Sequence, residues 1–91
     1  MEYVVYILYS NKTKRNYTGC SSHLIERFYS HNIYGKDSTR FYRPWIIVHV
    51  DFFESKSEAL KLEKYYKSGR GAKKKIELIN LFIDHWAHTL P

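Results

Sequence analysis

Apolar residues recur with two different periods along this chain, and the shorter period predicts strands. Residues 3–10 (YVVYILYS) are β-branched or aromatic on both alternating sets, which indicates a central strand. The polar stretch 11–16 predicts a turn, and a second strand over roughly 15–19 closes a hairpin that ends at Gly19, where we expect a backbone shape that other residues resist. The next strand is predicted over 45–53, with one wholly apolar face formed by Ile46, Val48, Val50 and Phe52.

The longer period predicts helices. Apolar residues at helical spacing indicate three of them, over about 22–32, 56–68 and 72–83. The apolar face of the first is expected at Leu24, Ile25 and Phe28, and the second begins with the capping box Ser55 to Glu58. The order β-β-α-β-α-α predicts an α+β fold, in which helices flank a small, three-stranded, mainly antiparallel sheet.

Polar residues interrupt the apolar faces of two of the predicted helices. His23, Arg27 and His31 are four residues apart, so they form a stripe that we expect at the rim of the buried face of the first helix. On the second helix, Glu63 falls in the middle of an apolar arc that includes Tyr66. A buried carboxylate needs a partner, a proton or a metal, and an ion pair with the lysine four residues on is the simplest alternative.

Length and charge narrow the class of protein. The 91 residues are expected to form one domain over 1–83 with a short tail over 84–91. The net charge of +6 favours a polyanionic partner, and we expect nucleic acid rather than a membrane surface. A single cysteine, Cys20, excludes an intrachain disulfide and a structural zinc finger. With no leader pattern and no apolar run of about 20 residues, we expect a cytoplasmic protein.

The order of five motifs resembles the GIY-YIG nuclease superfamily, over roughly residues 1–80. Val4-Val5-Tyr6 stands for the first tripeptide and Tyr17-Thr18-Gly19 for the second, and they are followed by Arg27, His31 and Glu63. The likeness is closest to small single-domain members and to the N-terminal domain of the excision-repair incision subunit. The sequence departs from the pattern at Val4, where the family has glycine, and at Cys20, where repair members have lysine.

The resemblance implies a role for each motif residue. Tyr17 would be the general base or would orient the nucleophilic water, and Tyr6 would align it. Arg27 would neutralise the phosphoryl oxygens, and His31 would share base duty or bind the phosphate. Glu63 would hold one Mg²⁺ or Mn²⁺ ion.

Further cations complete the expected substrate site. Lys67 matches a lysine of the small members, and the remaining cations are expected to contact phosphates of the nucleic acid backbone: Lys36, Arg40, Arg43, Arg70, Lys73, Lys74 and Lys75.

The expected function is that of a metal-dependent endonuclease that hydrolyses phosphodiester bonds of DNA, structure-selective and linked to repair or recombination. The alternatives are a non-catalytic nucleic-acid-binding module on the same fold and a protein-interaction domain with a residual motif. A monomer and a weak homodimer both stay open.

Overall fold

The computed structural model describes residues 2–34 and 38–86; the predicted phosphate contact Lys36 and the side chain of Arg40 lie outside the described residues. The elements confirm the predicted order, with short helical segments added between α1 and β3. They are β1 (Tyr3–Ser10), β2 (Arg15–Ser21), α1 (Leu24–Tyr29), η1 (Ser30–Tyr34), η2 (Ser38–Tyr42), β3 (Ile46–Phe53), α2 (Lys56–Tyr66) and α3 (Gly69–Trp86).

The three strands form one sheet in the order β2-β1-β3, and both pairings are antiparallel. The predicted fold class is therefore confirmed. Because β1 is the central strand, its residues 4–10 are all buried. They alternate between the two sides of the sheet, so that Val5 and Ile7 enter one apolar cluster and Val4 and Tyr6 enter the other.

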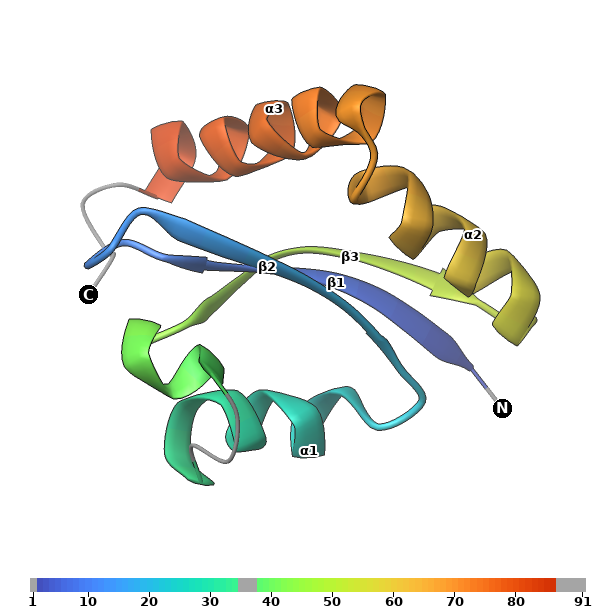
Figure 1. Ribbon diagram of the computed structural model, residues 1–91, viewed down its shortest axis with the longest axis horizontal. Helices are drawn as coiled ribbons and strands as arrows, with labels where there is room; N and C mark the ends of the chain where they lie inside the picture. The colour runs from blue at the N-terminus through green and yellow to red at the C-terminus, as the bar shows by residue number, and fades with distance from the viewer. Residues whose placement is uncertain (1, 35–37, 87–91) are drawn as a thin grey trace.

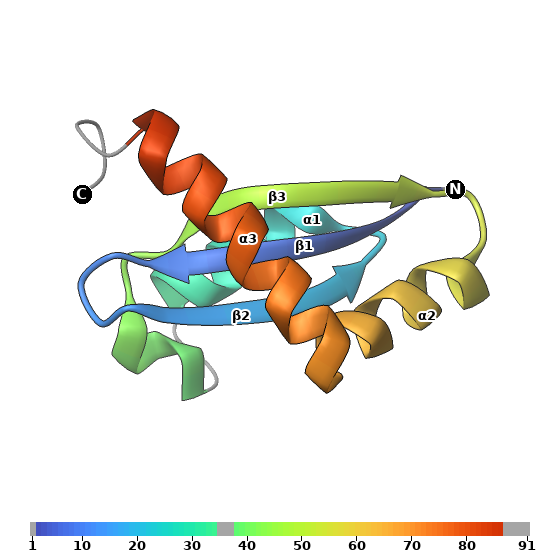
Figure 2. The same ribbon diagram turned by 90° about the horizontal axis from the view of Figure 1, so that it is seen from above.

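Helices cover both faces of the sheet. Figure 1 shows α2 and α3 above the sheet and α1 with the two short helical segments below it. Seen from above, α3 crosses the strands diagonally, whereas α2 lies beside the end of β2 (Figure 2). None of the helices within residues 2–34 and 38–86 is long and apolar enough to span a bilayer.

A β-bulge in β3 overturns the expected apolar face of this strand. Ile7 pairs with His49 but Leu8 pairs with Ile47, so Val48 is an extra residue in the ladder. After this residue the two faces exchange: Val48 contacts the cluster beneath α2 and α3, Val50 contacts the opposite cluster, and the side chain of Phe52 is 62% exposed. The exchange turns His49 and Asp51 toward the layer of α2 and α3.

The first helix is shorter than predicted, and its geometry changes after Tyr29. The chain continues as the π-helix η1, in which each residue rotates the backbone less than in an α-helix. The stripe expected at the rim is therefore wrong for one member, because His31 is fully buried while His23 and Arg27 are exposed.

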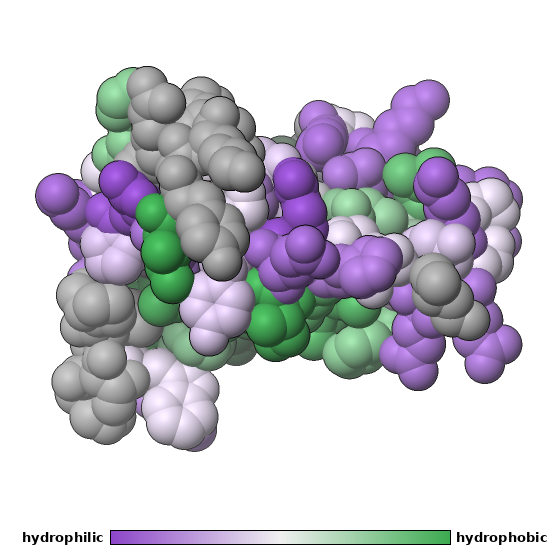
Figure 3. Space-filling view, turned by 90° about the horizontal axis from the view of Figure 1, so that it is seen from below, coloured by the Kyte–Doolittle hydropathy of each residue, from purple (hydrophilic) through white to green (hydrophobic). Residues whose placement is uncertain are grey.

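The expected apolar face of α1 is also only partly correct. Leu24 and Phe28 pack against the cluster below the sheet, but Ile25 lies about 100° round the helix from Leu24 and is 66% exposed. On this side of the molecule, hydrophobic areas are interrupted by hydrophilic side chains (Figure 3).

Asn32 ties the long connection after η1 to the start of β3. Its amide nitrogen donates to the carbonyl of Trp45 at 3.0 Å, and its amide oxygen accepts from the backbone N–H of Trp45 at 2.6 Å. The indole N–H of Trp45 donates to the carbonyl of Thr39 at 2.9 Å. These bonds fold η2 back under the sheet, next to His31.

The Asn32→Ala substitution should lower the free energy of unfolding by about 2 kcal/mol, because two backbone groups of Trp45 would lose their partners. Chemical denaturation measures the loss. Asn80→Ala, at an exposed position of α3, is the control and should change stability by no more than about 0.5 kcal/mol. Equal losses in both variants would contradict the assignment.

Candidate active site

Tyr6 and Gly19, one from each tripeptide, lie opposite each other on β1 and β2. A Cβ atom on residue 19 would overlap Cζ and Oη of Tyr6, so the phenol ring crosses β2 directly over the glycine. The φ angle of Gly19 lies outside the left-handed region. The expectation that this glycine supplies an unusual backbone shape is therefore wrong, and the close approach of the Tyr6 ring is what requires glycine here.

The hydroxyl of Tyr6 is buried and has two partners. It lies 3.3 Å from Nε2 of His31, and the guanidinium of Arg27 also interacts with it. Burial raises the pKa of Tyr6, and although the interaction with Arg27 opposes this rise, the net pKa stays above the ordinary value of about 10. Tyr6 is therefore a neutral phenol near pH 7.

His31 connects Tyr6 to a residue that the sequence did not single out. The other ring nitrogen, Nδ1, lies 2.8 Å from Oγ1 of Thr39, and both side chains are buried. Thr39 lies in the connection between η1 and β3, where the predicted site residues are cations and no local pattern marks the threonine. Only the packing of η2 against η1 places Thr39 next to His31, and this contact has no signal in the local sequence.

Tyr17 lies at the mouth of this cluster and is partly exposed. Its ring centroid is 4.7 Å from that of His31 and 6.4 Å from that of Tyr6. Arg27, on α1, interacts with both tyrosines, and its interaction with Tyr6 is the main cause that raises the pKa of its guanidinium. The structure thus brings together four of the predicted site residues on the side of α1.

The charge of Glu63 acts on this cluster from the opposite layer. It belongs to α2, the helix that lies beside the end of β2 in Figure 2, and its side chain is 21% exposed. Burial raises the pKa of the Cys20 thiol, and the carboxylate of Glu63 raises it further; the same carboxylate also contributes to the raised pKa of Tyr6. Its charge therefore acts on both β1 and β2 at this edge of the sheet.

The alternative role of Glu63, an ion pair with Lys67, is also present in the structure. The Nζ atom of Lys67 lies 3.4 Å from Oε2 of Glu63, so the two residues form an ion pair within α2. Lys67 is exposed, and such pairs contribute little to stability. A cation that competes for the carboxylate would therefore displace a weak partner.

The side chains that could bind a metal ion at Glu63 suit some metals better than others. Within the described parts of the chain, no group of three or more His, Cys, Asp or Glu residues gathers in one place. A single carboxylate does not make a tetrahedral zinc site, but it suits Mg²⁺ or Mn²⁺, which keep several of their water ligands. Glu63 is thus compatible with the expected ion.

The remaining predicted cations lie in different places. Nη1 of Arg43 donates to the carbonyls of Asn32 and Ile33 at 3.3 and 3.2 Å, which holds the end of η1. Arg70, Lys73 and Lys74 are exposed on the first turns of α3, on the other side of the sheet from Tyr6. Lys75, on the same turns, is half-buried, and burial together with the charge of Lys67 lowers its pKa.

The Gly19→Ala substitution should lower the free energy of unfolding by about 1–3 kcal/mol, because the buried Tyr6 ring must move away from its partners. Denaturant titration measures this, and the NMR signals of Tyr6 and His31 should shift. Gly69→Ala is the matched control, since a Cβ there meets nothing within 4 Å. A Gly19→Ala protein as stable as the control would contradict the close contact.

Tyr6 should ionise late in an alkaline titration followed by tyrosinate absorbance. Because its pKa is raised on folding, its contribution to stability is complete below about pH 10, the value of the unfolded chain, and is lost as the pH rises further. Tyr6→Phe should remove one group from the late fraction and make stability fall less steeply above pH 10. An unchanged titration curve would overturn this assignment.

Comparisons with known proteins agree with this geometry. A family model described as the GIY-YIG catalytic domain matches residues 2–77. The UPF0213 protein BH0048 of Bacillus halodurans, solved by NMR in solution, is 33% identical; the match covers 86% of this chain and 85% of that one, with a TM-score of 0.53. A comparison with the curated proteins finds no match. The resemblance inferred from the motifs is confirmed, and this chain belongs to the GIY-YIG nuclease superfamily.

Proposed function

We propose that this protein is a metal-dependent endonuclease that hydrolyses phosphodiester bonds of DNA. The observation that carries the proposal is the convergence of Arg27 on the hydroxyls of Tyr6 and Tyr17, at the edge where the charge of Glu63 also acts. These groups come from both strands of the hairpin and from helices on opposite faces of the sheet. Together they provide a basic group, a fixed cation and a metal ligand within one site.

Two tyrosines have different tasks in this proposal. Tyr17 is partly exposed, so its hydroxyl can reach a water molecule and orient it for attack on the phosphorus. Tyr6 is a buried neutral phenol, which suits a hydrogen-bond partner within the site better than a base. Arg27 is exposed on the side of the substrate, where its planar guanidinium can bind two phosphoryl oxygens.

His31 acts through its neighbours rather than on the substrate. Its complete burial leaves the ring no path to a phosphate, whereas its two nitrogens hold Tyr6 and Thr39. We therefore assign it the role of a positioning residue that fixes the phenol of Tyr6 and packs against the ring of Tyr17.

Glu63 would hold the Mg²⁺ or Mn²⁺ ion, which would stabilise negative charge that develops on the phosphate oxygens. Lys67 is close enough to Glu63 to take over a phosphate contact once the carboxylate binds the ion. Arg70, Lys73 and Lys74 would bind more distant phosphates and make affinity fall with salt. The proposed substrate is branched or otherwise non-duplex DNA in the cytoplasm, in repair or recombination, and the protein would act as a monomer or a weak homodimer.

One observation favours a non-catalytic nucleic-acid-binding module as the second candidate. The ion pair with Lys67 satisfies Glu63 without any metal. Such a module would bind DNA through the same cations and would not cut any substrate in the presence of Mg²⁺ or Mn²⁺.

Glu63→Gln should reduce the rate of metal-dependent cleavage by on the order of 100-fold or more, because the amide keeps the shape of the side chain but loses its charge. The assay follows cleavage of branched and single-stranded DNA with and without Mg²⁺ or Mn²⁺. Glu58→Gln, at an exposed ion pair with Lys61 on the same helix, should cut at the wild-type rate.

Two outcomes would contradict the proposal. If the wild-type protein binds DNA but cuts no substrate with either metal, the binding module replaces the nuclease. If Glu63→Gln cuts as fast as Glu58→Gln, the carboxylate is not the metal ligand.

A further inference from the structure

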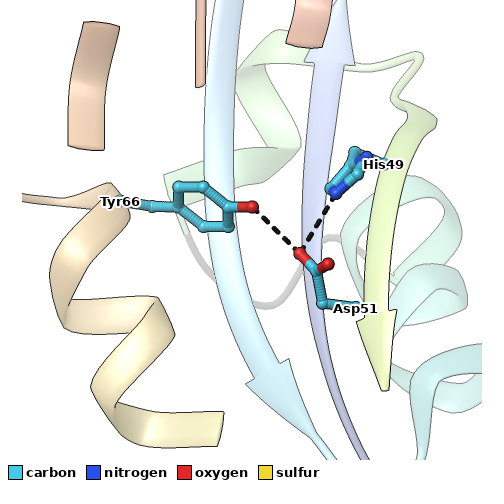
Figure 4. A network of polar contacts seen from close by, with 3 residues as sticks. All are labelled: His49, Asp51 and Tyr66. Carbon is cyan, nitrogen blue, oxygen red and sulfur yellow. Dashed lines mark hydrogen bonds and ion pairs between the residues drawn. The ribbon is translucent and has the colours of Figure 1, made fainter. Parts of the chain in front are cut away.

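A polar network away from Tyr6 joins α2 to β3. The hydroxyl of Tyr66 donates to Oδ2 of Asp51 at 2.9 Å, and Nε2 of His49 lies 3.1 Å from the same oxygen. Figure 4 shows Tyr66 reaching from α2 across β2 to meet Asp51, whose side chain extends from β3. The bulge at Val48 places both β3 residues on this face.

The hydrogen bond between Tyr66 and Asp51 is not needed to fill the apolar layer. Tyr66 is 4% exposed and belongs to the cluster of Val5 and Ile79. A phenylalanine would pack in the same space without a hydroxyl that needs a partner, so the polar pair is not required for burial. What the pair adds is a fixed distance and direction between the last turn of α2 and the sheet.

Few side chains of α2 are buried. Only Ala59 and Tyr66 are buried among its residues, and its other side chains are half-buried or exposed. Within residues 2–34 and 38–86, the bond from Tyr66 to Asp51 is the one side-chain hydrogen bond between α2 and the sheet. Glu63 lies between the two buried residues, four positions after Ala59 and three before Tyr66. A shift of Tyr66 would therefore move Glu63.

The same turn of α2 is also held from above. A Cβ on Gly71 would overlap the backbone carbonyl of Tyr65, so the first turn of α3 lies directly on the last turn of α2. The turn of α2 that follows Glu63 is therefore packed against α3 at Gly71 and attached to β3 through Tyr66.

We propose that Tyr66 and Asp51 are positioning residues that set the place of Glu63 and thereby the affinity of the site for its divalent cation. His49 holds the Asp51 carboxylate toward Tyr66. The inference rests on the proposed function, because it assigns these residues to the same metal ligand. It predicts that loss of the hydrogen-bond acceptor on β3, on the far edge of the sheet from β2, alters metal binding at Glu63.

The test is a Mn²⁺ titration of the full chain without DNA, followed by paramagnetic broadening of the amide signals around Glu63. Tyr66→Phe should weaken Mn²⁺ binding about tenfold, in the range found when an outer partner of a metal ligand is removed. Asp51→Asn keeps an oxygen that accepts the hydrogen bond and should bind Mn²⁺ within about threefold of the wild type, because the bond and not the charge positions the helix.

Two further variants separate positioning from loss of stability. Ile79→Val removes a methyl group from the same buried cluster, so it should lower Tm without changing Mn²⁺ affinity. The double variant Tyr66→Phe/Asp51→Ala should bind Mn²⁺ no more weakly than Tyr66→Phe alone, because both changes break one bond.

The outcomes distinguish this inference from the proposed function. Wild-type affinity in Tyr66→Phe, together with lost affinity in Glu63→Gln, would overturn the positioning role and leave the metal ligand in place. Equal weakening in Ile79→Val and Tyr66→Phe would also overturn it, because general destabilisation would then be the cause. If Mn²⁺ broadens the amide signals of the wild type and of Glu63→Gln identically, Glu63 binds no metal and the proposed function fails with it.

Discussion

Tyr6 places a hydroxyl in the apolar layer between α1 and the sheet, where an unpaired polar group would be costly. Much of the nearby structure can be understood as the response to this constraint. Gly19 leaves room for the ring to cross β2, and Arg27 and His31 provide the partners of the oxygen. A buried His31 in turn needs a partner for its second nitrogen, which Thr39 supplies. A hydrogen-bonded series thus runs from the central strand to the connection before β3.

The candidate site is assembled from both faces of a thin sheet. Four residues lie on the side of α1, while Glu63 comes from α2 on the other side, and its charge acts on Tyr6 from there. The arrangement makes the site sensitive to the placement of α2. The bulge in β3 contributes to that placement, since it turns Asp51 toward Tyr66. A distortion on one edge of the sheet therefore supports a carboxylate on the other edge.

The charges of the site balance one another in a specific way. Arg27 lies against two tyrosines, and the carboxylate of Glu63 raises the pKa of Tyr6 from the other side. Lys67 compensates Glu63 across a weak ion pair. A divalent cation and a phosphate would replace this pair with stronger interactions of the same signs, the carboxylate with the metal and the lysine with the phosphate.

The sequence by itself determined the order of elements, the class of fold, the family and the one carboxylate that stands out on its helix. These follow from alternation, helical spacing and motif order, which report on residues close together in the chain. The tertiary structure alone decided which histidine nitrogen contacts Tyr6 across 25 residues of chain, that Arg43 holds the end of η1, and that Val48 exchanges the faces of β3. The π-helix that buries His31 and the bond from Tyr66 to Asp51 belong to the same group. Each depends on contacts between segments far apart in the chain, so no local pattern of residues could encode it.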